Sequence, residues 1–209
     1  MTFGAVVFDL GGVVFPSPLD VFRVYEREHG LPHRFISEVV LADPERGAWG
    51  RLERGELTLE EFCDAFDAEC AAHGGTVDSR DLMQAVGAGL DPRASMVTAI
   101  GAIRDHGLKT GALTNNWADD AGRREASPTA GWFDVVVESA VEGLRKPDPR
   151  IYLLVCERLD VLPKAAVFLD DLGANLKPAR ELGMTTIKVD DPDAALAELE
   201  SVLGFALAG

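Results

Sequence analysis

Residues 5–14 read AVVFDLGGVV. The apolar run before Asp9 is rich in Val and Phe, which is typical of a buried β-strand. Asp9 ends this run, and Gly11 and Gly12 follow it, so the backbone can come close to a charged group there. In parallel α/β sheets, ligands bind beyond the carboxyl ends of the strands. Asp9 is therefore a candidate nucleophile or metal ligand, although an aspartate that caps a turn would fit the same residues.

From Asp91 onward, the sequence alternates between expected helices and strands. Three helix starts are marked by an N-capping aspartate followed by proline, at Asp91-Pro92, Asp148-Pro149 and Asp191-Pro192. The apolar runs between the helical patterns predict strands at 108–114, 133–138, 165–170 and 185–189. Together with the first strand, this order predicts an α/β fold with a parallel sheet covered by helices.

Residues 16–90 break the alternation and carry only helical patterns. Thr58 and Glu61 form a capping box, and an apolar stripe at helical spacing follows from Leu59 to Cys70. Further helices are expected at 19–29 and 78–86. The sequence thus predicts a helical module of residues 16–90 inserted directly after the first strand of a core made by residues 1–15 and 91–209.

The composition of the chain limits the kinds of binding partner that we expect. The 209-residue chain has a formal net charge of −15 and no basic run, so we expect no nucleic acid partner, because phosphate backbones are bound by clustered Lys and Arg. The odd number and wide spacing of its three cysteines argue against a disulfide framework or a zinc site. No leader segment and no apolar run of about 18 residues is present, so we expect no membrane partner and a cytoplasmic protein.

Four segments at or just beyond the expected strand ends carry groups suited to phosphoryl transfer. They are Asp9, LTNN at 113–116, GLRKPD at 143–148 and FLDDLGAN at 168–175. Such a transfer needs a nucleophilic carboxylate together with donors and cations that hold the charge of the phosphoryl group. Asp9, Asp170 and Asp171 would repel one another if crowded together, unless a hard cation such as Mg²⁺ lay between them.

In order and wording, these segments resemble the haloacid dehalogenase-like hydrolase superfamily over nearly the whole chain. Residues 113–117 (LTNNW), 146–152 (KPDPRIY) and 168–180 resemble one branch in particular. That branch contains the N-terminal phosphatase domain of soluble epoxide hydrolase and the related domain of acyl-CoA dehydrogenase 10. The resemblance implies a Rossmann-like core, with residues 16–90 as a helical cap over the site.

The resemblance also implies a metal site at the sheet edge. Asp9 and Asp171 would bind Mg²⁺ together with the backbone carbonyl of Gly11. Asp170 precedes the main metal carboxylate, and Asn175 lies where many relatives have another acid. These two residues are therefore implied to act indirectly or through water.

Four residues are implied to handle the phosphoryl group. Asp9 is the implied nucleophile. Thr114 and the amide of Asn115 would hold the phosphoryl oxygens, and Lys146 would neutralise charge on both the phosphoryl group and Asp9. The expected activity is a Mg²⁺-dependent phosphatase that acts on a small phosphorylated metabolite.

One position departs from the pattern. Phosphatases of this superfamily usually have a second aspartate two residues after the nucleophile, as a general acid and base, and Gly11 stands there. Such help is typically worth ~10²–10⁴-fold in rate. A Glu or His of the cap could replace it, a good leaving group such as an acyl phosphate could make it unnecessary, or competence could be lost.

Two other functions therefore stay open. A 2-haloacid dehalogenase uses the same carboxylate without a metal, although the acidic pair at 170–171 suits a cation better than a halide. A catalytically impaired binding module is the other. The sequence does not set the substrate, the oligomeric state, or which of five residues in the module face the site: Phe22, Tyr25, Trp49, Arg51 and Glu53.

Overall fold

The computed structural model describes residues 3–88, 91–117, 129 and 131–207, and its centre is a parallel five-stranded sheet. The strands are β1 (Ala5–Phe8), β2 (Lys109–Thr114), β3 (Val135–Glu138), β4 (Ala166–Asp170) and β5 (Thr185–Lys188). Their order in the sheet is β3-β2-β1-β4-β5. The predicted α/β fold with a parallel sheet is therefore confirmed, with each strand within two residues of its expected bounds.

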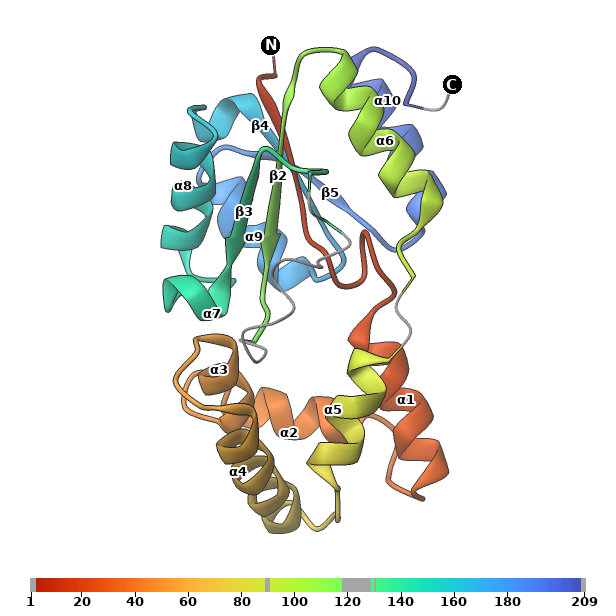
Figure 1. The fold of residues 1–209 in the computed structure, drawn as a ribbon, viewed down its shortest axis with the longest axis vertical. Coiled ribbons are helices and arrows are strands. Elements are labelled where there is room, and N and C mark those ends of the chain that lie inside the picture. The colour runs from red at the N-terminus through yellow and green to blue at the C-terminus, as the bar shows by residue number, and fades with distance from the viewer. Residues whose placement is uncertain (1–2, 89–90, 118–128, 130, 208–209) are drawn as a thin grey trace.

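Helices cover both faces of the sheet (Figure 1). On one face, Val6 and Phe8 of β1 pack in a core with α6 (Ala94–Asp105) and α10 (Pro192–Leu203). On the other face, Ala5 and Val7 pack with α8 (Pro149–Arg158) and α9 (Gly173–Glu181). Since successive side chains of a strand point to opposite faces, the unbroken apolar run of β1 reflects burial on both sides.

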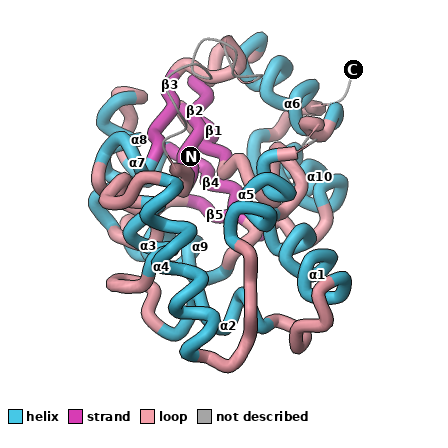
Figure 2. The backbone as a smooth tube through the Cα atoms, turned by 60° about the horizontal axis from the view of Figure 1, so that its bottom comes forward, coloured by secondary structure: helices cyan, strands magenta, loops and turns pink. Residues whose placement is uncertain are grey.

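The helical module forms its own layer beyond the carboxyl ends of the strands (Figures 1 and 2). Its helices are α1 (Pro18–Glu28), α2 (Phe35–Ala42), α3 (Ala48–Glu53), α4 (Leu59–Ala72) and α5 (Ser79–Gly87). They bury a separate apolar core that includes Cys63 and Cys70, as their helical spacing predicts. The amide of Arg93 donates to the carbonyl of Val14 at 2.8 Å, so the two connections to the sheet meet at one point.

Helices α2 and α3 lie in the predicted helical region, but sequence patterns did not delimit them. The N-terminus of α2 is capped by Glu26 of α1, whose carboxylate accepts from the amides of Arg34 and Ile36 at 2.8 and 2.9 Å. That of α3 is capped by Glu69 of α4, which accepts from the amide of Ala48 at 2.8 Å. Caps supplied by other helices leave no local signal in the sequence.

Two shorter elements complete the core part, α7 (Ser139–Glu142) and the 3₁₀ turn η1 (Pro163–Ala165). Across the described ranges of the chain, the structure contains no helix with the length and apolar character needed to cross a bilayer.

Candidate active site

Asp9 directly follows β1 and lies buried at the carboxyl edge of the sheet. Its amide donates to the carbonyl of Leu169 at 2.9 Å, which ties it to β4. One carboxylate oxygen, Oδ1, accepts from the amide of Leu10 at 2.7 Å, and Oδ2 pairs with Lys146 Nζ at 2.8 Å. Both oxygens are thus held in place, which fixes the direction in which Asp9 faces.

Lys146 is the cation at the centre of this edge. Its side chain is 1% exposed, and Nζ lies 2.8 Å from Asp9 and 2.7 Å from Asp170. Burial acts to lower the pKa of Lys146, but the two carboxylates outweigh burial and raise it. The lysine therefore stays charged between its two partners.

Asp170 ends β4, and its carboxylate is surrounded by donors. Besides Lys146, it accepts from the side-chain amide of Asn175 at 3.0 and 3.1 Å and from the amide of Leu172 at 2.8 Å. Asn175 is in turn fixed by Tyr152, whose hydroxyl donates to its carbonyl at 2.8 Å. Asp170 thus holds Lys146, and Asn175 holds Asp170.

Asp171 is only partly buried and faces the turn after β1. Ser17 Oγ lies 3.3 Å from its Oδ2. Gly12 has φ +81°, and a Cβ added there would overlap the Asp171 carboxylate. Glycine is therefore favoured at this position, both by its backbone conformation and by the close approach of Asp171.

The three carboxylates fit a divalent cation. Asp9, Asp170 and Asp171 each offer one oxygen, and these oxygens lie within 4.8 Å of one another. Burial raises the pKa of Asp171 to about 6, with Asp170 adding to the shift. Burial also raises the pKa of Asp9 well above its ordinary value, because Lys146 opposes the shift only in part. Such crowding of hard oxygen donors is relieved by Mg²⁺.

The members of the set differ in how free they are to bind a metal. Each oxygen of Asp170 has two donors, whereas each oxygen of Asp9 has one, so Asp9 and Asp171 have more room to bind a metal. Gly11, whose carbonyl the family resemblance adds to this set, lies in the same turn and forms a β-bridge with Phe15.

Thr114 ends β2 and Asn115 follows it, next to Asp9. β2 pairs with β1, with Phe8 opposite Ala112, so Thr114 and Asp9 share one edge of the sheet. Thr114 Oγ1 lies 3.4 Å from the carbonyl of Asn115, a long hydrogen bond that a ligand could replace. The side chain of Asn115 exchanges two hydrogen bonds with the backbone of Lys146, at 2.8 and 3.1 Å. The structure therefore joins the loop after β2 to the loop that carries the lysine.

Other residues around the site were not predicted from the sequence. Asn116 binds Ser139 and Glu138, with its amide 2.9 Å from Ser139 Oγ and its Nδ2 2.7 Å from Glu138 Oε1. Arg145, next to Lys146, pairs with Glu53 of α3 at 2.7 Å. Ser139 lies in no motif, and only its place directly after strand β3 could have indicated it. Arg145 lies within the segment at 143–148, but the sequence assigned it no role.

The helical module meets the site through aromatic residues and Glu53. Trp117 follows Asn115-Asn116 and packs edge-on against Trp49, at a centroid distance of 6.4 Å. Of the five residues left open by the sequence, Phe22, Tyr25 and Trp49 are buried in the core of the module. Glu53 turns to the loops of the sheet, where Asn115 Nδ2 donates to it at 3.3 Å.

The chain was compared with known proteins. A family model described as haloacid dehalogenase-like hydrolase matches residues 3–183. Acyl-CoA dehydrogenase family member 10 of Mus musculus is 41% identical over 99% of the chain, and bifunctional epoxide hydrolase 2 of Sus scrofa is 35% identical over 99%. The chain spans only 20% and 40% of the lengths of these two proteins.

Two further matches cover nearly all of the proteins concerned. The sesquiterpene phosphatase astK of Aspergillus oryzae is 27% identical over 97% of the chain and 98% of its own length. A HAD family enzyme from Bacteroides thetaiotaomicron, solved with magnesium and inorganic phosphate, is 22% identical and superposes with a TM-score of 0.62, covering 89% of this chain and 93% of its own. The motif order of the sequence, the sheet it forms and the family match agree: the chain belongs to the haloacid dehalogenase-like hydrolases.

Proposed function

We propose that this protein is a Mg²⁺-dependent phosphatase that hydrolyses a small phosphorylated metabolite through an aspartyl-phosphate on Asp9. One observation carries the proposal: Lys146 Nζ lies within 2.8 Å of both Asp9 and Asp170, while an oxygen of Asp171 lies within 4.8 Å of theirs. A nucleophilic carboxylate, a buried ammonium and an oxygen-donor set are what phosphoryl transfer through a covalent carboxylate needs.

Asp9 is the proposed nucleophile. Its carboxylate oxygen forms a bond to phosphorus as the bond from phosphorus to the ester oxygen breaks, and the departing alkoxide takes up a proton from water. A second water then attacks phosphorus and the bond from phosphorus to the Asp9 oxygen breaks, which releases inorganic phosphate and restores the carboxylate. The Leu10 amide and Lys146 hold the two oxygens of Asp9 and so orient it for the first step.

The remaining residues hold charge and position. Thr114 and the amide of Asn115 bind the phosphoryl oxygens, and Lys146 balances their negative charge. Asp170 and Asn175 keep Lys146 in place through the contacts described above. A magnesium ion held by Asp9, Asp171 and the carbonyl of Gly11 would neutralise charge shared by the phosphoryl group and the carboxylates.

The helical module is proposed to act as a cap over a core of residues 1–15 and 91–209. Its separate aromatic core and its two connections, joined between Arg93 and Val14, support this division. Seated over the strand ends, it would exclude bulk water from the phosphoryl group. The sesquiterpene phosphatase of matching length supports a phosphorylated small molecule as the substrate class.

Gly11 keeps the 2-haloacid dehalogenase and the impaired binding module as alternatives, because the usual general acid is missing there. The acidic trio speaks against the dehalogenase, since crowded carboxylates repel a halide. Chelation distinguishes the two candidate activities. If the protein is the proposed phosphatase, EDTA should abolish turnover of a phosphate ester. Release of halide from a 2-haloacid at a rate that EDTA does not change would favour the dehalogenase.

The decisive experiment replaces the nucleophile. With Mg²⁺ present and p-nitrophenyl phosphate and a panel of phosphorylated metabolites as substrates, we expect Asp9→Asn to abolish turnover. Asp20→Asn makes the same chemical change at an exposed aspartate paired with Arg23, and we expect it to match the wild-type protein. Turnover retained in Asp9→Asn would remove Asp9 from its role, and a wild-type protein inactive on the whole panel would favour the binding module.

A further inference from the structure

Glu53 is the buried carboxylate that the helical module presents to the sheet. In the described part of the module, two carboxylates are buried, Glu26 and Glu53. Glu26 caps α2 within the module. Glu53, 8% exposed, instead faces the loops that follow β2 and precede α8. A carboxylate buried between two parts of a molecule costs stability unless it is paired, so its partners show what it does.

Glu53 has three polar partners, and two of them belong to the loops of the site. Its Oε2 lies 2.7 Å from Arg145 Nε and 3.3 Å from Asn115 Nδ2. Its Oε1 accepts from Trp49 Nε1 at 3.1 Å, which fixes the carboxylate on its own helix. One side chain of the module therefore binds two loops of the sheet at once.

These two partners are the immediate neighbours of the proposed phosphate-binding residues. Asn115 follows Thr114 and supplies a proposed amide donor, and Arg145 precedes Lys146. Asn115 also bonds the backbone of Lys146 at both its amide and its carbonyl. A shift of Glu53 would thus be transmitted through one or two bonds to the groups that hold the phosphoryl oxygens.

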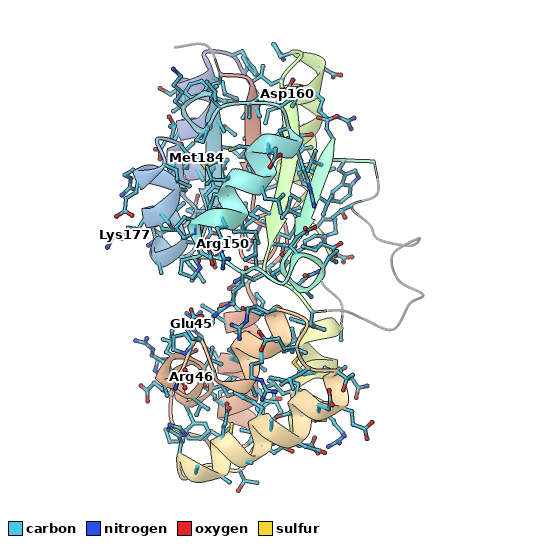
Figure 3. The ribbon with its side chains drawn as sticks, turned by 90° about the vertical axis from the view of Figure 1, so that its left-hand side faces the viewer. Glu45, Arg46, Arg150, Asp160, Lys177 and Met184 are labelled. Carbon is cyan, nitrogen blue, oxygen red and sulfur yellow. The ribbon has the colours of Figure 1, made fainter. Side chains whose placement is uncertain are left out.

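The packing around this link leaves little room for adjustment. Arg145 also donates from Nη1 to the carbonyl of Pro44 at 2.6 Å, in the loop between α2 and α3. A Cβ at Gly50 would overlap that same carbonyl, and one at Gly55 would overlap the carbonyl of Ala140 in α7. Glu45, in the same loop as Pro44, lies on the side of the module that faces the sheet (Figure 3). α3 is therefore seated directly on the core.

We propose that Glu53 is a positioning residue that couples seating of the helical module to assembly of the phosphate pocket, by holding Arg145 and Asn115 so that Lys146 and the amide of Asn115 face one phosphoryl group. This inference rests on the proposed function. It gives the module a defined part in the reaction besides excluding water: the pocket is complete only with α3 in place.

Glu53 does not fit the alternative role of a proton donor that replaces the acid missing at Gly11. Both of its oxygens are already engaged: Oε1 accepts from Trp49, and Oε2 accepts from Asn115 and pairs with the Arg145 guanidinium. A proton donor must instead be turned to the leaving oxygen. The two roles predict different pH profiles.

The test is a double-mutant cycle on Glu53→Gln and Arg145→Met. Glu53→Gln keeps the shape of the side chain but removes the ion pair, and Arg145→Met breaks the same link from the core side, should Glu53→Gln fail to fold. The measurements are the Kd of inorganic phosphate by calorimetry with Mg²⁺ present, kcat and KM for a phosphate ester across pH, and the Tm. Glu56→Gln is the matched control, because Glu56 is an exposed carboxylate paired with Arg54 just beyond α3.

We expect each single variant to weaken phosphate binding about tenfold and to lower kcat about 10–100-fold, since small misplacements of binding groups cost up to ~10² in rate. KM should change less than kcat, and the shape of the pH profile should be kept. The double variant should recover part of the loss, because it leaves no buried charge without its partner. Glu56→Gln should behave as the wild-type protein.

Two outcomes would overturn the positioning role. One is a lower Tm of Glu53→Gln with Kd and kcat unchanged, which would make the link purely structural. The other is loss of the alkaline limb of the pH profile with an unchanged phosphate Kd, which would make Glu53 a proton donor. If the wild-type protein turned over no ester but Glu53→Gln still weakened its binding of phosphate, the proposed function alone would be overturned. A wild-type protein that binds no phosphate would overturn both.

Discussion

The carboxyl edge of the sheet buries charged groups, whereas the interior of the helical module buries aromatic rings. At the edge, Lys146 is enclosed between Asp9 and Asp170. In the module, Trp49 packs edge-on against Phe22 at 5.2 Å and Phe62 at 5.4 Å. Buried charges lose hydration that their pairing only partly repays, while aromatic packing is a net gain. The edge is therefore built for chemistry and the module for shape.

The two regions also differ in what one substitution should change. A residue of the edge should affect both activity and stability, because each charge there has partners that its removal leaves unpaired. A residue in the interior of the module should affect stability first. Glu53 is the exception that connects them, since it belongs to the module by sequence and to the edge by its contacts.

Removal of the central cation should have the largest effect. Lys146→Met leaves Asp9 and Asp170 without their shared partner, so we expect the free energy of unfolding at pH 7 to fall by about 3–5 kcal/mol. Phosphatase kcat should fall on the order of 10²–10³-fold, as for loss of one group that stabilises transition-state charge. Urea unfolding and steady-state kinetics measure the two quantities.

Lys188→Met is the control for this prediction, because Lys188 forms an exposed pair with Asp190 at 2.7 Å. Exposed pairs are worth about 0–1 kcal/mol, so this variant should be nearly unchanged. If Lys146→Met and Lys188→Met changed stability and kcat equally, the buried charges at the edge would have no special role.

Alanine substitutions at two glycines, one in each region, allow a direct comparison of the edge with the module. Gly12 at the edge and Gly74 in the module have φ +81° and +86°. A Cβ at Gly12 would overlap the Asp171 carboxylate, whereas nothing lies within 4 Å of one at Gly74. Alanine at either site should cost about 1 kcal/mol through its backbone. Only Gly12→Ala should weaken Mg²⁺ binding, by about 10–100-fold, because it displaces a ligand.

Calorimetric titration of each glycine variant with Mg²⁺ checks this prediction. The same measurement on wild-type protein tests the metal site itself. Equal Mg²⁺ affinities of Gly12→Ala and Gly74→Ala would exclude Asp171 as a ligand in the position that the structure gives it.

Restoring the missing acid should have a smaller effect, and a positive one. A Cβ at Gly11 would lie 3.3 Å from Pro18 Cδ, a tight contact, and Gly11 does not have a left-handed backbone. We expect Gly11→Asp to raise kcat for alkyl phosphates about tenfold, below the 10²–10⁴-fold of an evolved acid. The gain should shrink for acyl phosphates, whose leaving groups need less protonation.

Gly11→Asn has the same size without the proton, so it separates acid catalysis from a change in shape. Rates of both variants on an alkyl and an acyl phosphate make the comparison. If both variants lost activity on both substrates, the acid would be supplied from elsewhere, and the space at Gly11 would itself be needed.

Most of the edge could be predicted from the sequence, and most of the module could not. Strands such as β1 and β4 can be recognised in the sequence as apolar runs. Parallel strands bring their carboxyl ends together, so Asp9 and Asp170 were expected at the same edge of the sheet. The caps of α2 and α3 come from Glu26 and Glu69, on other helices. Glu53 meets Asn115 across 62 residues. Contacts of this kind are set by tertiary packing, and no local pattern records them.

The smallest expected effect is the contribution of Glu53 to the pH dependence of the free energy of unfolding. Burial raises the pKa of Glu53 even though Arg145 opposes the shift. The folded protein therefore keeps this proton at a pH where the unfolded chain, with an ordinary value of 4.5, has released it. The free energy of unfolding then falls as pH rises from about 4.5 through the raised pKa. Relative to Glu53→Gln, the wild-type protein should lose stability across this range.

Glu61 provides a control of opposite sign within the same module. The amide and hydroxyl of Thr58 lower the pKa of Glu61, so its contribution is present above about 4.5 and is lost as pH falls through the lowered pKa. Urea unfolding from pH 3 to 8 of wild-type protein, Glu53→Gln and Glu61→Gln compares the two slopes. The difference in the free energy of unfolding between wild-type protein and Glu61→Gln should rise with pH. If the difference between wild-type protein and Glu53→Gln also rose with pH, the ion pair with Arg145 would outweigh burial in its effect on the pKa of Glu53. The charge at α3 would then stabilise the fold as a salt bridge, and the contrast between a charged edge and an apolar module would no longer hold at their junction.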